Sequence, residues 1–258
     1  MSEPAAIEPR PSASIVLVRD GADGLEVFVQ RRASTMAFAP GVTVFPGGGM
    51  SVADTDASVP WAGPAPAWWA EKFGVDEETA RGLVCAAVRE TFEESGVLLA
   101  STAGAEPSGE RYPDARDALA SGAISLAEFL RSEGLVVRAD LLRPWANWIT
   151  PAGEKRRYNT RFFAAALPAG QQADGKTTEA VETGWYRPAA LIDIWARGEA
   201  VLMPPTWAQL DALLGLDFIE SAMTLTRNVT PIAPRWVDGR LDFPDSARYL
   251  AVVSKIRG

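Results

Sequence analysis

A crowded run of carboxylates constrains this chain most strongly. The segment RETFEESGV, Arg89 to Val97, holds Glu90, Glu93 and Glu94 within one short stretch. If the stretch is helical, residues three and four apart share a face, where like charges repel by about 0.2–0.5 kcal/mol per pair. Such a run is either an ordinary solvated helix face or a group of oxygens that surrounds a cation.

The flanking residues predict that this run lies on a helix. Acidic residues from Asp76 to Glu78 suit the positive N-terminal end of a helix, and Gly96 suits its C-terminal end. The glutamates lie beside an apolar stripe, with Glu94 nearest to it. We therefore expect Glu94 to be the least hydrated of the three. The stripe consists of Val84, Ala87, Val88, Thr91 and Phe92.

Two features favour a cation over a solvated face. A small Ser-Gly pair ends the helix, and FPGGG (residues 45–49) forms a glycine corner after a predicted strand, where backbone carbonyls can approach a ligand closely. Hard oxygen ligands suit Mg²⁺ or Mn²⁺, ions that usually bind substrate phosphates as well. We expect Arg89 then to brace a neighbouring carboxylate, that of Glu93 at i+4.

Composition narrows the chemistry. The chain has one cysteine, Cys85, and no histidine, so internal disulfides, zinc ligand sets and Ser-His or Cys-His nucleophiles are excluded. The formal net charge of −8 argues against a broad nucleic-acid or anionic-membrane surface. No apolar run approaches the roughly 20 residues of a membrane helix. We expect a cytoplasmic protein without a membrane segment, in which residues 1–13 form a disordered, Pro-rich lead.

Strand and helix signals mix without regular alternation, which predicts an α/β or α+β chain with a mixed sheet. The GADG sequence between two β-branched runs indicates a hairpin over residues 14–32. Residues 101–122 are small and polar and are expected to form a loop. Further strands are expected at 42–49, 145–150, 157–167, 180–186 and 249–253, and helices at 124–134, 188–199, 204–215 and 217–226.

RETFEESGV resembles the second half of the Nudix (MutT-like) box, Gly-x5-Glu-x7-Arg-Glu-U-x-Glu-Glu-x-Gly-U, where U is aliphatic. Gly48 matches the leading glycine, and Asp54 stands where the family has glutamate. Thirty-four residues separate Asp54 from Arg89, where the family has seven. We interpret the excess as an insertion at about 55–80, whose tryptophans require burial. These are Trp61, Trp68 and Trp69.

The resemblance implies a Nudix α/β/α sandwich: one domain, 14–258, with a mixed sheet between helices and a largely helical or irregular insertion. We expect the insertion at the rim of the site or in a homodimer interface. The region QRRASTMAFAPGVTVFPGGG is similar to the segment upstream of the box in coenzyme A diphosphatases of the family, although Ala37 stands where that signature has arginine. The insertion is similar to that of the long-insert branch.

The resemblance also implies an activity, the Mg²⁺- or Mn²⁺-dependent hydrolysis of a diphosphate linked to a nucleoside. Coenzyme A or an acyl-CoA is the first substrate, with ADP-ribose, dinucleoside polyphosphates and capped RNA as rivals. A Nudix-like ligand-binding module without turnover is the alternative, disfavoured because such modules typically lose the glutamates of the box. The implied metal ligands are Gly48, Glu90, Glu93, Glu94 and Glu179 (with Glu182 as substitute), the catalytic residues Arg89, Glu93, Glu94 and Glu179, and the substrate contacts Arg32, Gly47, Gly48 and Arg157.

Overall fold

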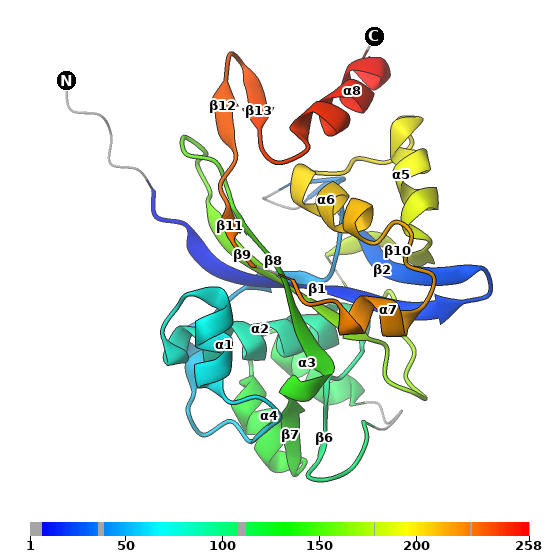
Figure 1. The fold of residues 1–258 in the computed structure, drawn as a ribbon. Coiled ribbons are helices and arrows are strands. Elements are labelled where there is room, and N and C mark those ends of the chain that lie inside the picture. The colour runs from blue at the N-terminus through cyan, green and yellow to red at the C-terminus, as the bar shows by residue number, and fades with distance from the viewer. Residues whose placement is uncertain (1–6, 36–38, 108–111, 178, 228, 258) are drawn as a thin grey trace, which may run out of the picture.

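A mixed β-sheet forms the middle of the molecule (Figure 1). The computed structural model describes residues 7–35, 39–107, 112–177, 179–227 and 229–257. The strands follow the order β10-β2-β1-β9-β8-β11, with β3 paired to β2 and β4 paired to β1. They are β1 (Arg10–Gly21), β2 (Gly24–Arg32), β3 (Thr43–Val44), β4 (Gly47–Gly49), β8 (Leu142–Ile149), β9 (Tyr158–Ala166), β10 (Ala180–Tyr186) and β11 (Pro231–Ile232).

β1 organises this sheet. It forms the predicted hairpin with β2, in the register Gly21 to Gly24, and runs parallel to β9 over nine residue pairs from Arg10–Tyr158 onward. Antiparallel and parallel neighbours confirm the mixed sheet. Because β1 begins at Arg10, the predicted lead was wrong for residues 10–13. Residues 1–6 lie outside the described part of the chain.

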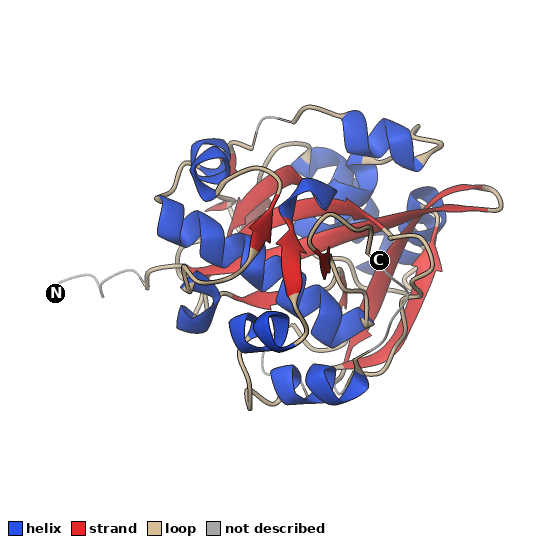
Figure 2. Cartoon of the chain, turned by 90° about the horizontal axis from the view of Figure 1, so that it is seen from below, coloured by secondary structure: helices blue, strands red, loops and turns tan. Residues whose placement is uncertain are grey.

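Alternate residues of β1 enter two separate cores, as the period of a strand requires. Ile15 and Leu17 pack on one face of the sheet, and Val16 and Val18 pack on the other. Helices cover both faces (Figures 1 and 2). The predicted α/β/α sandwich is therefore confirmed. One layer contains α1 (Pro66–Phe73), α2 (Glu77–Ser95), α3 (Pro113–Ala120) and α4 (Leu126–Ser132); the other contains α5 (Pro188–Ala196), α6 (Pro204–Ala212), α7 (Ile219–Thr224) and α8 (Ser246–Arg257).

The helix that carries the carboxylates, α2, begins and ends as predicted. The Asp76 carboxylate caps it by accepting a hydrogen bond of 2.7 Å from the Thr79 amide. Gly96 ends it in the left-handed conformation, at φ 73°. Beside this layer lies a small three-stranded sheet with two 3₁₀ turns. These elements are β5 (Trp61–Ala62), β6 (Ala100–Thr102), β7 (Leu135–Arg138), η1 (Val52–Thr55) and η2 (Ala139–Leu141).

Two local predictions were wrong. Residues 249–253, expected as a strand, belong to α8, where the Tyr249 ring stacks on Trp195 at 5.1 Å and meets Trp207 edge-on at 5.6 Å. A short apolar run does not distinguish a strand from a buried helix, so packing decides. The loop expected at 101–122 contains α3, which begins with Pro113. A hairpin, β12 (Arg235–Val237) and β13 (Arg240–Asp242), was also not predicted.

The insertion folds onto the domain rather than apart from it. Its main element is α1, together with the short strand β5. Trp69 is fully buried; it stacks on Phe73 of α1 and contacts Phe163 of β9 at a tilt, whereas Trp68 remains 36% exposed. The expected burial therefore holds for Trp69 and only in part for Trp68. Within the described ranges, no helix combines the length and apolarity needed to cross a bilayer.

Candidate metal and substrate site

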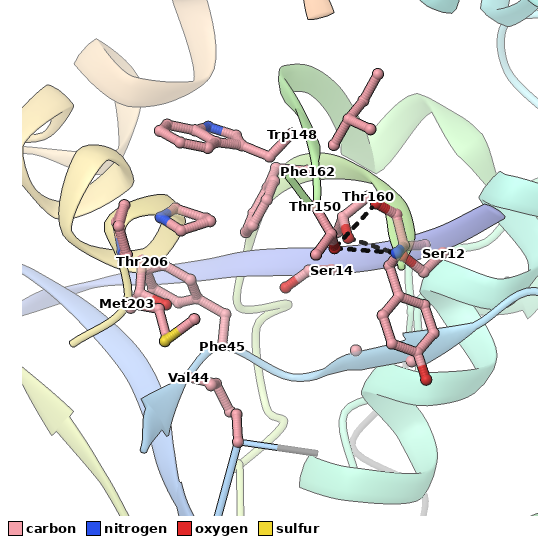
Figure 3. Close-up of a pocket in the computed structure, with 18 of the residues that line it drawn as sticks. Ser12, Ser14, Val44, Phe45, Trp148, Thr150, Thr160, Phe162, Met203 and Thr206 are labelled. Carbon is pink, nitrogen blue, oxygen red and sulfur yellow. Dashed lines mark hydrogen bonds between the residues drawn. The ribbon is translucent and has the colours of Figure 1, made fainter. Parts of the chain in front are cut away.

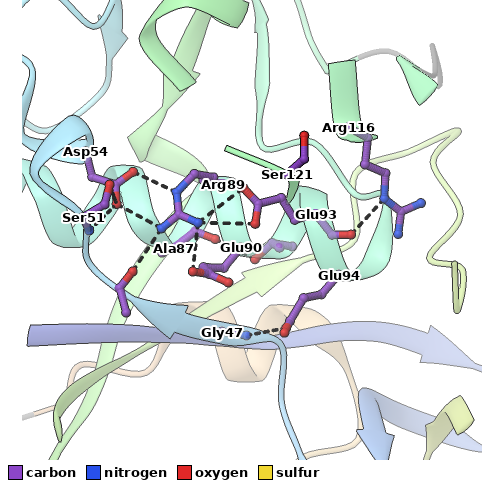
Figure 4. Close-up of polar contacts among 12 residues, drawn as sticks. Gly47, Ser51, Asp54, Ala87, Arg89, Glu90, Glu93, Glu94, Arg116 and Ser121 are labelled. Atoms are coloured by element: carbon purple, nitrogen blue, oxygen red, sulfur yellow. Dashed lines mark hydrogen bonds and ion pairs between the residues drawn. The ribbon is translucent and has the colours of Figure 1, made fainter. Parts of the chain in front are cut away.

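Glu94 links α2 to the glycine strand β4 (Figure 4). Its Oε2 accepts hydrogen bonds from the Gly47 amide and from Gln30 Nε2, both at 2.7 Å. Glu94 is only 3% exposed, and its Oε1 has no hydrogen-bond partner among the described residues. Burial raises the pKa of Glu94 well above its ordinary value, with a further rise from the charge of Glu90. The prediction that Glu94 is the least hydrated of the three glutamates is confirmed, since the side chains of Glu90 and Glu93 are each 13% exposed.

Glu90 lies against Gly48, so a side chain at this position would force the Glu90 side chain to move. A Cβ at Gly48 would collide with the Glu90 carboxylate. Gly48 is no tight turn: it belongs to β4 and pairs with Ala13 of β1. The glycine therefore serves close approach between a strand and a carboxylate. Burial raises the pKa of Glu90 to about 7.

Arg89 is the centre of the polar network (Figure 4). Its Nη1 contacts Glu90 Oε1 at 2.9 Å and both Glu93 carboxylate oxygens at 3.3 Å, so the predicted i+4 brace to Glu93 is present. Its Nε and Nη2 donate to the two carboxylate oxygens of Asp54, at 2.9 and 3.0 Å, and Nη2 also reaches the Gly49 carbonyl. Burial alone would lower the pKa of Arg89. The Asp54 hydrogen bonds and the charges of Asp54, Glu90 and Glu93 outweigh this effect, so the pKa of Arg89 is raised above its ordinary value.

Sequence reasoning missed two members of this network. Asp54 is 1% exposed, and it also accepts hydrogen bonds from the amide and hydroxyl of Ser51. Its spacing from Gly48 was the available signal, because it occupies the box position of a glutamate. Gln30 is a 1% exposed amide in the middle of β2, and a buried polar residue in an apolar strand pattern indicates a specific partner.

These residues fit a divalent cation by their chemistry, although they do not form a preformed cluster. No group of three acidic or sulfur side chains in the described part converges on one point as a metal site. The reason is visible in the contacts: Glu90 and Glu93 turn to Arg89, and Glu94 turns to Gly47. Burial raises the pKa of all three glutamates, which means that their charges lack full compensation. A cation would supply it.

A cavity of about 450 Å³ opens beside this network (Figure 3). The glycine strand, Glu90, Arg32 and Glu179 are among its lining residues. Ser12 and Thr160, joined by a 2.8 Å hydrogen bond, also line it. Another part of the lining is apolar, and Figure 3 shows several of these side chains grouped together. It includes Val44, Phe45, Trp148, Phe162, Met203 and Leu241.

The remaining predicted residues separate into two groups. Arg32 and Glu179 line the cavity and face each other, with Nη2 and Oε2 3.8 Å apart. Glu182, the substitute for Glu179, is instead paired with Arg31 at 3.0 Å on an exposed strand edge. Ala37, where the diphosphatase signature has arginine, lies outside the described residues.

Arg156, rather than the predicted Arg157, lines the cavity together with Arg32. Arg156 is among the described lining residues. Arg157 donates to the carbonyls of Ile7 and Thr150 and holds the backbone instead. No residue of 55–80, all of which the structure describes, lines the cavity. The insertion begins with Thr55, the last residue of η1, which carries Asp54.

The chain is similar to known proteins. The model of the NUDT19 Nudix domain matches residues 72–213. A Caenorhabditis elegans candidate nudix hydrolase 7 is 31% identical over 204 residues, which is 79% of this chain and 60% of that protein. The Homo sapiens acyl-coenzyme A diphosphatase NUDT19 is 26% identical, over 74% of this chain and 61% of its own length. The chain thus spans about 60% of the length of these curated relatives.

The fold is similar to that of a solved structure as well. A NUDIX hydrolase from Alicyclobacillus acidocaldarius superposes with a TM-score of 0.72 at 29% identity, over 86% of this chain and 99% of that one. The family model covers more than half of the chain, and it includes the helix that carries Arg89 and the three glutamates. The chain belongs to the Nudix family.

Proposed function

We propose that this protein hydrolyses the diphosphate bond of a nucleoside diphosphate conjugate in a reaction that depends on Mg²⁺ or Mn²⁺, with coenzyme A or an acyl-CoA as the substrate. One observation carries the proposal. The glycine strand β4 meets the buried carboxylates of Glu90 and Glu94 at the wall of a cavity that also holds Arg32. The negative charges of these carboxylates are not fully neutralised by the protein, and the guanidinium of Arg32 can contact a phosphate group. Together they suit a diphosphate that is bound with a cation.

The chain's own residues have distinct parts in this reaction. Glu90, Glu93 and Glu94 would hold the ions, with Gly48 and Glu179 beside them. When bound, the ions neutralise diphosphate oxygens and lower the pKa of a bound water. Arg89 keeps Glu90 and Glu93 in place, as their contacts of 2.9 and 3.3 Å indicate. Among the described residues, Glu90 and Glu179 are the carboxylates that line the cavity, which supports either as the acceptor of the proton of the attacking water.

Recognition of the conjugate would use both the charged and the apolar residues that line the cavity. Arg32 is only 16% exposed and lies 3.8 Å from Glu179, so a phosphate group can compete with that long pair. Arg156 also lines the cavity. The apolar lining residues suit the uncharged part of the conjugate, and Phe45 and Phe162 offer flat surfaces among them. The acyl-coenzyme A diphosphatases among the relatives support coenzyme A as the first candidate.

Two companion predictions remain part of the proposal. A cytoplasmic location is supported by the lone thiol of Cys85, which is buried and has a pKa raised to about 12 by that burial. A homodimer is supported by the partly exposed Trp68 of the insertion. Light scattering that shows a monomer would remove the dimer.

The decisive test is a substrate panel. The purified protein is incubated with Mg²⁺ or Mn²⁺ and coenzyme A, an acyl-CoA, ADP-ribose, a dinucleoside polyphosphate or capped RNA, and products are identified by mass spectrometry. We expect phosphopantetheine, or its acyl form, together with 3′,5′-ADP, and no product in the presence of a chelator. Preferential turnover of another conjugate would replace the substrate. Inactivity on the whole panel would favour the binding module.

A further inference from the structure

The C-terminal end of α2 concentrates negative charge. Glu93 and Glu94 lie in its last turns, where the helix dipole is negative as well. α2 lies wholly within the described chain and has no basic residue of its own in the last turn. The end of such a helix needs a donor from elsewhere to satisfy its free carbonyls.

Arg116 of α3 supplies that donor. Its Nε donates to the backbone carbonyl of Glu93 at 3.0 Å, which Figure 4 shows. Its Nη1 donates to Asp174 Oδ1 at 2.8 Å. The two side chains are 9% and 20% exposed, so solvent screens this ion pair little. Arg116 therefore contacts both the backbone of the glutamate helix and the segment that follows β9.

The same segment is fastened to the end of α2 by backbone contacts. The Asp174 amide donates to the Ser95 carbonyl at 2.8 Å. The Gln171 side chain exchanges two hydrogen bonds with the backbone of Leu98, at 2.8 and 2.9 Å. Gly96 permits the close approach, because a Cβ there would lie 2.9 Å from Arg116 Nη1. The Arg116–Asp174 ion pair is thus one of several contacts that join the segment at residues 171–174 to the end of α2.

This junction lies next to a residue of the candidate site. Glu179 follows Asp174 by five positions, and its backbone carbonyl accepts a hydrogen bond of 2.8 Å from Ala33, at the end of β2. Asp174 is therefore held by α2, and Glu179 is held by the sheet. Glu179 lines the same cavity as Glu90 of α2.

We propose that Arg116 is a positioning residue of the hydrolytic site: through the Glu93 carbonyl and Asp174 it fixes Glu179 relative to the glutamates of α2. The proposal rests on the proposed function, because it concerns the geometry in which the same carboxylates act. Arg116 itself touches no part of the cavity, since it is absent from the described lining residues.

Four variants test the positioning role: Arg116→Gln, Arg116→Lys, Asp174→Asn and the double variant Arg116→Gln/Asp174→Asn. A misplacement near 1 Å costs about 10²-fold in rate, so we expect kcat to fall by about tenfold to a hundredfold in each glutamine or asparagine variant. The metal concentration for half-maximal activity should rise and the substrate KM should stay nearly unchanged. The kcat of the double variant should be no lower than that of the worse single variant, because both substitutions remove the same Arg116–Asp174 ion pair. Arg116→Lys should retain part of the rate.

Arg138→Gln is the matched control. Arg138 pairs with Asp140 at 2.7 Å and is 13% exposed, yet it lies on the small sheet and is not among the described residues that line the cavity. It should lose stability comparably while it keeps kcat and the metal dependence. Equal losses of kcat in Arg138→Gln and Arg116→Gln would overturn the proposal, since the loss of activity would then come from general destabilisation.

Amide hydrogen exchange gives a readout that needs no turnover. In Arg116→Gln, the Asp174 and Leu98 amides should exchange faster than in the unsubstituted protein, while amides in the middle of α2 should keep their protection. Unchanged exchange together with unchanged kcat would overturn the proposal. If the unsubstituted protein turned over no conjugate, the proposed function would fail, and the exchange rates alone would decide whether Arg116 fixes this segment.

Discussion

Arg89 and Asp54 form a two-pronged ion pair across 35 positions of sequence, with Nε–Oδ1 at 2.9 Å and Nη2–Oδ2 at 3.0 Å. The pair joins the end of the glycine region to the glutamate helix and closes the insertion at its base. The insertion lengthens the chain between these two parts of the box without separating them in space. The length of the insertion is therefore compatible with an intact site.

Asp54→Asn should destabilise the fold. Asp54 is 1% exposed and receives donors from both Arg89 and Ser51. Removal of one partner of a buried pair costs about 3–5 kcal/mol, because the other charge remains uncompensated. Urea denaturation should report this loss. Asp56→Asn, at a solvated carboxylate that accepts only from Ser58 in the described contacts, is the control and should leave the midpoint almost unchanged.

Gly48→Ala should damage the site while the sheet survives. The new methyl group would meet the Glu90 carboxylate and displace it. We expect an activity loss of about 10²-fold, the scale of a small misplacement of a reacting group. Gly49→Ala is a close control, since a Cβ there has no neighbour within 4 Å in the described structure. Steady-state kinetics should separate the two, and equal activity in both variants would refute the role of Gly48.

Glu94→Gln should remove metal-induced stabilisation without lowering the melting temperature of the metal-free protein. Burial penalises the charged carboxylate of Glu94, and an amide keeps an oxygen that can accept from Gly47 and Gln30. At a metal concentration of 100 Kd the unsubstituted protein should gain about 2.7 kcal/mol. The variant should gain almost nothing and lose orders of magnitude in turnover. Glu182→Gln, at an exposed pair with Arg31, should behave like the unsubstituted protein.

A lower melting temperature of metal-free Glu94→Gln would show that Glu94 is structural. Full activity with unchanged metal dependence would instead remove the candidate metal centre. Calorimetry with and without Mg²⁺ distinguishes these outcomes. The two measurements together decide between a ligand and a structural carboxylate.

The metal-free protein should lose stability as the pH rises from about 4.5 to about 7. Burial raises the pKa of Glu90 from 4.5 to about 7, so the folded protein binds more protons than the unfolded chain in that window. Stability then falls with rising pH. Carboxylates with lowered pKa values, such as Asp140, act below the window and with the opposite sign. The difference between the unsubstituted protein and Glu90→Gln isolates the effect.

Chemical denaturation across this pH range, in a chelator, measures that difference. Saturating Mg²⁺ should reduce the slope, because metal ligands bind in their deprotonated form. A slope that is zero or positive in the chelator would contradict the buried, uncompensated state of Glu90. The measurement needs no substrate.

Periodicity predicted the parts of the fold that local chemistry determines. The hairpin at residues 21–24 and the limits of α2 at Asp76 and Gly96 depend on neighbouring residues, and both are confirmed. α8 depends on distant contacts, since Tyr249 packs on Trp195 and Trp207. An apolar run carries no record of those partners, and the strand predicted there was wrong.

The candidate site divides in the same way. The i+4 contact of Arg89 with Glu93 follows from helix geometry and was predicted. Gln30 and Arg116 reach the site from separate elements, and their spacing in sequence gives no sign of it. Arg116 was hidden further because its helix was predicted as a loop. Long-range hydrogen bonds of this kind become visible only when the chain is folded.

The parallel pairing of β1 with β9 has a consequence for how the molecule is made. Ser12 and Thr160, which are hydrogen-bonded to each other in the cavity lining, are separated by 148 positions. Contacts of such separation slow folding, because a long loop must close before they form. During synthesis, the first strands must wait for β9 to leave the ribosome, and until then β1 presents an unpaired edge that can aggregate. The cavity is thus among the last features that a newly made chain acquires.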